Sequence, residues 1–60
     1  MVSDVEYFSR RAREEREAAM RAAHAHVRQI HHELADAYEL RVRELSADAR
    51  RSGIHLVSAA

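Results

Sequence analysis

The chain lacks cysteine, proline, tryptophan and lysine, and it contains one glycine. The absence of cysteine excludes disulfide bonds, thiolate zinc sites and thiol catalysis. Without proline, and with glycine so rare, the sequence has almost none of the residues that usually interrupt helices. A chain of 60 residues buries little surface on folding, and without cysteine it cannot be stabilised by disulfide bonds. We therefore expect a helical protein that gains stability from another chain.

The charge and hydropathy patterns narrow the class of protein. Ten arginines balance ten acidic residues, and the two signs alternate along the chain, which disfavours a nucleic-acid partner. No apolar run approaches the roughly 20 residues that span a bilayer. Residues 1–4 have neither the basic nor the apolar region of a signal peptide. These features predict a cytoplasmic protein without a membrane partner.

Helix-forming residues dominate positions 4–51, and both ends of this stretch carry helix signals. Ser3 and Glu6 fit a capping box, in which each side chain accepts a hydrogen bond from the other residue's amide. Gly53 can take the left-handed conformation that closes a helix. Residues 54–60 are then expected to form a short apolar tail, which either folds back or serves as a partner motif.

Two apolar stripes with helical spacing divide the chain. The first holds Val5, Phe8, Ala12, Glu15, Ala19 and Ala22, and the second holds Val27, Ile30, Leu34, Ala37, Tyr38, Leu45 and Ala49. At about 100° per residue, the two stripes differ in direction by roughly 80–120°. A break near residues 22–26 lets them meet in an antiparallel hairpin. This predicts an all-α domain over residues 1–53, with helices at about 4–22 and 26–51. The alternative is one long helix in a coiled-coil-like assembly, because the segment lacks turn residues.

One string of residues resembles a known pattern. It runs through Tyr7-Phe8, Arg11-Ala12 and Glu15, and then through His31, Glu33-Leu34-Ala35 and Tyr38-Glu39. It is similar to short alphaproteobacterial proteins with the pattern Y-F-x-x-R-A-x-x-E followed by H-x-E-L-A-x-x-Y-E. The resemblance implies a bacterial helical hairpin and carries no established activity.

The predicted hairpin has few large apolar residues with which to build a core. The small residues of the first stripe are expected to receive the large residues of the second. Because a hairpin buries only one face per helix, we predict a homodimer that closes a four-helix bundle, with a monomeric hairpin as the alternative. The expected interface residues are Val5, Phe8, Ala12, Glu15, Ala19, Val27, Ile30, His31, Leu34, Tyr38 and Leu45.

Two features bear on chemistry. Glu15 interrupts an apolar stripe, and in a hairpin it falls near His31, with Arg11 as another partner. The pair is either an acid/base pair or a buried polar latch that sets the helix register, and the lack of other active-site features favours the latch. No pair among the five histidines has the i, i+3 or i, i+4 spacing of metal ligands on one helix. We predict no catalytic residue, metal or cofactor, and keep pH sensing as an alternative role for the histidines.

These observations predict a non-enzymatic protein–protein interaction module that acts as a small homo-oligomeric hairpin, with another protein as an alternative partner. The alternative is a small transcription-linked or nucleic-acid-associated regulatory factor. It would use a local basic patch that includes Arg10, Arg11 and Arg13.

Overall fold

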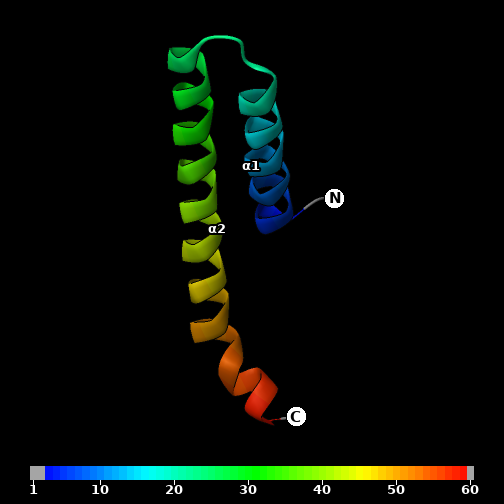
Figure 1. Ribbon diagram of the computed structural model, residues 1–60. Coiled ribbons are helices and arrows are strands. Elements are labelled where there is room, and N and C mark those ends of the chain that lie inside the picture. Colours follow the sequence, from blue (N-terminus) through cyan, green and yellow to red (C-terminus); the bar gives the residue numbers. More distant parts are fainter. Residues whose placement is uncertain (1–2, 60) are drawn as a thin grey trace.

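The computed structural model describes the backbone of residues 3–59 and the side chains of residues 3–51. It contains two helices, α1 (Asp4–Arg21) and α2 (Ala25–Ala59), which lie antiparallel and are joined by a short turn (Figure 1). The helices contact each other along the whole of α1, in a molecule of 52 × 20 × 12 Å. The predicted all-α hairpin is confirmed, and the alternative of one long helix is wrong.

The start of α1 is fixed by the predicted capping box. The Ser3 hydroxyl accepts a hydrogen bond from the Glu6 amide at 3.1 Å, and the Glu6 carboxylate accepts one from the Ser3 amide at 3.2 Å. Asp4 and Glu6 also place negative charge in the first turn, where the helix dipole favours it. The first residue of α1 is therefore specified locally.

The turn at residues 22–24 forms without glycine or proline. Ala22 leaves the helix in an extended conformation, with φ −73° and ψ 132°. The Arg28 guanidinium donates hydrogen bonds to the carbonyl oxygens of Ala22 and Ala23, at 3.1 and 3.3 Å. These bonds satisfy carbonyls that the end of α1 leaves free. A side chain from the first turn of α2 thus closes the connection.

The predicted end of the second helix is wrong. α2 continues through Gly53 to Ala59, and no glycine in the described chain has a positive φ. Glycine permits the left-handed conformation but does not require it, and within a helix it costs only about 1 kcal/mol relative to alanine. Most of the expected tail at 54–60 is therefore helical. The side-chain contacts expected of that tail lie outside the described residues.

α2 extends well past the first residue of α1 (Figure 1). Phe8 stacks on Tyr38 near the open end of the hairpin, with ring centroids 5.8 Å apart. With Phe8 opposite Tyr38 and Glu15 opposite His31, α1 begins opposite about residue 42 of α2. At 1.5 Å per residue, α2 beyond residue 42 adds roughly 25 Å of helix without α1 beside it.

The contact between the helices is built from small residues. Ala12, Ala19 and Ala35 are buried, and no large side chain is fully buried among the described residues. Small side chains allow two helices to approach closely, but they bury little apolar area. The hairpin therefore has a thin core.

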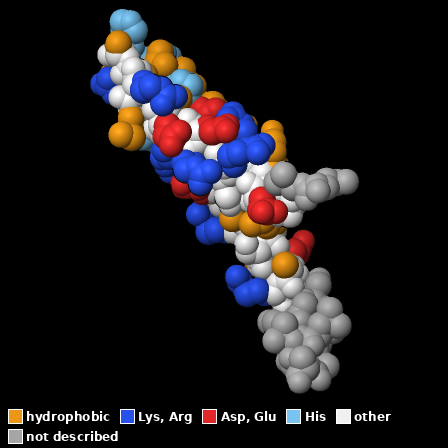
Figure 2. Space-filling view, turned by 90° about the vertical axis from the view of Figure 1, so that its right-hand side faces the viewer, with side chains coloured by type: hydrophobic (Ala, Val, Ile, Leu, Met, Phe, Trp, Pro, Cys, Tyr) orange, Lys and Arg blue, Asp and Glu red, His pale blue; other side chains and the backbone are white. Residues whose placement is uncertain are grey.

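The described residues include no helix with the combined length and hydropathy that crossing a membrane requires. Both helices instead carry charged side chains along their outer faces. Figure 2 shows acidic and basic side chains intermixed over the middle of one face, with hydrophobic and histidine side chains at the turn end.

Candidate functional site

A buried carboxylate lies between the helices. Glu15 is only 8 % exposed, and its two oxygens contact different partners. One accepts a hydrogen bond from His31 Nδ1 at 2.6 Å, and the other accepts one from the Arg11 guanidinium at 2.7 Å. The hydrogen bond from His31 lowers the pKa of Glu15; burial opposes this shift, and Arg11 adds to it. Glu15 is therefore held ionised at neutral pH, beside the histidine that the sequence predicted.

Arg11 connects this carboxylate to the rest of the hairpin. Its guanidinium also contacts Glu14 at 2.6 Å and lies 5.2 Å from the centre of the Tyr38 ring. The hydrogen bonds to Glu14 and then to Glu15 raise the pKa of Arg11 above its ordinary value. Because Tyr38 and His31 belong to α2, the cluster ties the two helices together at one register. The arrangement supports the latch interpretation, since both carboxylate oxygens of Glu15 are already engaged.

One side of the hairpin is closed by polar contacts, and we call it the polar flank. Arg16 of α1 donates hydrogen bonds to Asp36 at 2.7 Å and to Glu39 at 2.8 Å, and it lies 3.0 Å from His32 Nδ1. The bond to Asp36 and then that to Glu39 raise the pKa of Arg16. Sequence reasoning missed this bridge, because only the register of the folded hairpin shows which acidic residues Arg16 can reach.

The opposite side of the hairpin is apolar. On α2, Val27, Ile30 and Leu34 are 38 %, 41 % and 41 % exposed. At 100° per residue, Leu34 and Ile30 are turned away from His31 in one direction, whereas Asp36 and Glu39 are turned in the other.

The adjoining residues of α1 are small. Ala18 and Ala22 are half-buried, and Ala18 is turned away from Glu15 in the direction opposite to Arg16. Since Arg16 marks the polar flank, Ala18 faces the other side of the hairpin, beside the valine, isoleucine and leucine of α2. The residues of this side are hereafter the apolar flank: Ala18, Ala22, Val27, Ile30 and Leu34.

The predicted interface residues fall into three groups. Ala12, Glu15 and Ala19 are buried between the helices; Val5, Phe8, His31, Tyr38 and Leu45 are half-buried; and Val27, Ile30 and Leu34 are exposed. Val27, Ile30 and Leu34 therefore lie outside the hairpin core, where the sequence placed them, whereas Tyr38 and Leu45 of the same stripe are half-buried. His31 and Ala35 occupy the positions that face α1, and this displaces the aliphatic residues to the side.

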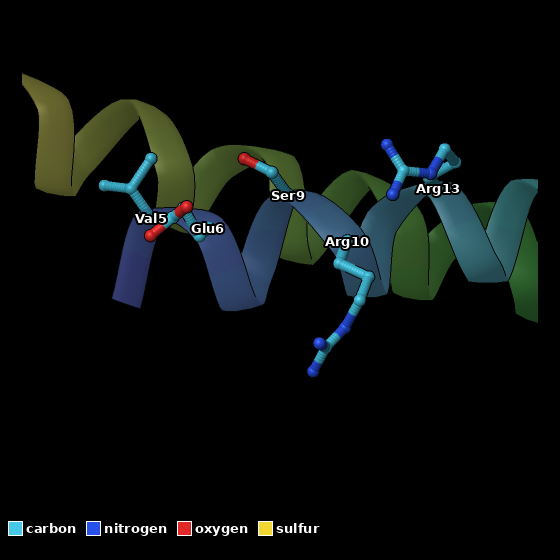
Figure 3. Close-up of a pocket in the computed structure, with 5 residues that line it drawn as sticks. All are labelled: Val5, Glu6, Ser9, Arg10 and Arg13. Carbon is cyan, nitrogen blue, oxygen red and sulfur yellow. The ribbon is translucent and has the colours of Figure 1, made fainter. Parts of the chain in front are cut away.

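A shallow hollow lies at the start of α1, lined by Val5, Glu6, Ser9, Arg10 and Arg13. Figure 3 shows that the Arg10 and Arg13 side chains extend from the helix in opposite directions. Two guanidinium groups bind one anion only when they converge on it. The hollow is therefore not arranged as an anion site.

Within the part of the chain that the structure describes, no three His, Asp or Glu side chains gather closely enough to hold a metal ion. Comparison with known protein families, curated proteins and solved structures found no match for the chain. The resemblance to short alphaproteobacterial proteins stays a prediction. The apolar flank is therefore the candidate functional site.

Proposed function

We propose that the chain is a non-enzymatic protein–protein interaction module that works in the cytoplasm as a homodimer. The observation that carries the proposal is the apolar flank, where the large aliphatic residues Val27, Ile30 and Leu34 are each more than a third exposed. Contiguous exposed apolar surface on a small domain typically marks a protein contact. A second hairpin on this flank completes a four-helix bundle.

Charge favours a protein partner over nucleic acid. Arg10, Arg11 and Arg16 each lie within 3.8 Å of a carboxylate oxygen of the same chain. The positive charges of these three arginines are offset by carboxylates within the chain. They thus offer little of the unpaired positive charge on which nucleic-acid affinity depends.

Light scattering on a sizing column tests the proposal. We expect the unmodified chain to elute at twice its 6.9 kDa mass at micromolar concentration. Ile30→Glu places a carboxylate in the apolar contact and is expected to raise the dissociation constant by at least about 100-fold, because an unpaired buried charge costs several kcal/mol.

Met20→Glu is the matched control. Met20 is 83 % exposed and lies outside the apolar flank, so this variant is expected to stay dimeric. A folded monomer for the unmodified chain would contradict the proposal. So would equal dissociation of the Ile30 and Met20 variants.

A further inference from the structure

We propose a specific arrangement of the two hairpins, which rests on the proposed dimer. The second copy lies with its turn at the same end of the bundle, so that α2 of each copy packs on α1 of the other. Val27 and Ile30 then contact Ala18 and Ala22 of the second copy. The apolar flank is thereby a docking site for a second copy in one orientation.

Two arrangements bring the apolar flanks face to face with two-fold symmetry. When the axis runs along the helices, the turns lie together and α2 faces α1 of the second copy. When the axis runs across the helices, the turns lie at opposite ends and each helix faces its own counterpart. Side-chain size and charge distinguish these arrangements.

Side-chain size favours the arrangement with the turns together. Glu15 lies opposite His31, and Phe8 lies opposite Tyr38. In this register Ala18 is level with Val27 and Ile30. Rotation about an axis along the helices keeps each residue at its level, so these large side chains meet the small ones of the second copy. Large residues interdigitate with small ones, which fills space at an interface without strain.

Leu34 fits the same arrangement one turn further along α2. It is level with Arg11 of α1, whose side chain is 28 % exposed. The aliphatic stem of an arginine covers apolar surface while its guanidinium keeps its polar partners. Arg11 holds two carboxylates and the Tyr38 ring in that position. Leu34 thus meets a stem that is already fixed in place.

Charge at the end of the hairpin away from the turn also favours the arrangement with the turns together. Arg41 contacts Glu44 of its own chain at 3.4 Å, and both side chains are 53 % exposed. A contact at the surface between such exposed groups is weak, so the guanidinium can also pair with a second carboxylate. In the register of the hairpin, Arg41 is level with Asp4 and Tyr7 at the start of α1. Tyr7 is 42 % exposed. With the turns together, Arg41 reaches the Asp4 carboxylate and the Tyr7 ring of the second copy, as an ion pair and a cation–π contact. With the turns at opposite ends, Arg41 instead lies near the alanines of the other turn.

Cysteine crosslinking tests the orientation, because the chain has no cysteine of its own. Two single variants, Ala18→Cys and Val27→Cys, are mixed as folded proteins and oxidised. We expect a disulfide-linked dimer from the mixture and none from either variant alone, because identical positions lie diagonally across the bundle. A disulfide needs the two Cα atoms within about 7 Å. The parallel mixture of Val27→Cys with Leu34→Cys reports the alternative arrangement, because an axis across the helices at the centre of the three large flank residues brings these two positions together.

Circular dichroism and light scattering on each variant first show that it is folded and dimeric. Crosslinking of Val27→Cys with Leu34→Cys, in place of Ala18→Cys, overturns the orientation and leaves the dimer standing. A dimeric mass with neither crosslink shows that the copies meet on another surface, which also overturns the orientation. A monomeric mass for the folded unmodified chain overturns the proposed function itself.

Discussion

The two flanks of the hairpin differ in how they are completed. On the polar flank, Arg16 of α1 reaches across to Asp36 and Glu39 of α2, so the chain satisfies this surface by itself. On the apolar flank, Ile30 and Leu34 stay 41 % exposed, and the flank residues of α1 beside them, Ala18 and Ala22, are too small to cover them. Two helices with a thin core can thus hold one register through ion pairs on one side, while apolar side chains on the other side stay free to contact a second chain.

We expect the largest loss of stability from a substitution that forces the helices apart, because it disturbs the contacts on both flanks. Ala19 is fully buried where the helices cross, so Ala19→Leu overfills the contact. Overpacking typically costs about 1–3 kcal/mol in unfolding free energy, and in a domain of this size each kcal/mol lowers the melting temperature by about 4–8 °C. Thermal unfolding by circular dichroism measures the change.

Ala49→Leu is the control for that substitution. Ala49 is exposed on α2 and lies beyond the start of α1, so the larger side chain meets no neighbouring helix. Equal loss of stability in the two variants would show that the alanines do not set the distance between the helices.

A smaller effect is expected from the polar flank. Arg16→Ala removes the shared partner of Asp36 and Glu39, which then repel each other at close range. We expect the melting temperature to fall by a few degrees, with the dimer dissociation constant unchanged, because this flank lies away from the second copy. Molar salt should reduce the difference, since these side chains are partly exposed.

Arg13→Ala is the control for this substitution. Arg13 is exposed on the outer face of α1, and its replacement removes the same charge from the chain. If Arg16→Ala weakens the dimer as much as Ile30→Glu does, the division of the hairpin into a closed flank and an open one is wrong.

The smallest effect concerns acid stability. The pKa of Glu15 is lowered from its ordinary value of 4.5, first by the hydrogen bond from His31. A carboxyl with a lowered pKa in the folded state stabilises the fold above its ordinary pKa, and this contribution is lost as the pH falls through the folded value. We therefore expect the urea midpoint to fall as the pH drops below 4.5, and Glu15→Gln to flatten this dependence.

Glu17→Gln is the matched control, because Glu17 is exposed on the same helix. The same slope of urea midpoint against pH in the Glu15 variant and the unmodified chain would mean that the latch does not contribute to acid stability.

Local signals in the sequence predicted the features that depend on neighbouring residues. The capping box at Ser3 and Glu6 needs only one turn of helix, and it formed as predicted. The contact between Glu15 and His31 followed from the expected hairpin and the phase of the first stripe. Both are set by spacing along the chain.

Features that depend on three-dimensional position were missed. Arg28 closes the turn by reaching back to two carbonyls, and no spacing rule marks an arginine for this role. Val27, Ile30 and Leu34 were expected in the hairpin core, but α2 is rotated so that His31 and Ala35 face α1 together with Tyr38 of the predicted stripe. A buried hydrogen-bonded pair thus outweighed the apolar pattern in setting the rotation of α2.

The short turn also has a consequence for the order of folding. Because residues 22–24 join the helices directly, the residues beside the turn are close in sequence and lose little chain entropy when they meet. Contacts of low sequence separation form quickly, so we expect the helices to close from the turn outward. The stacked rings of Phe8 and Tyr38 lie at the far end of the hairpin. They are then the last pair to join when the chain folds, and the first to separate when it opens.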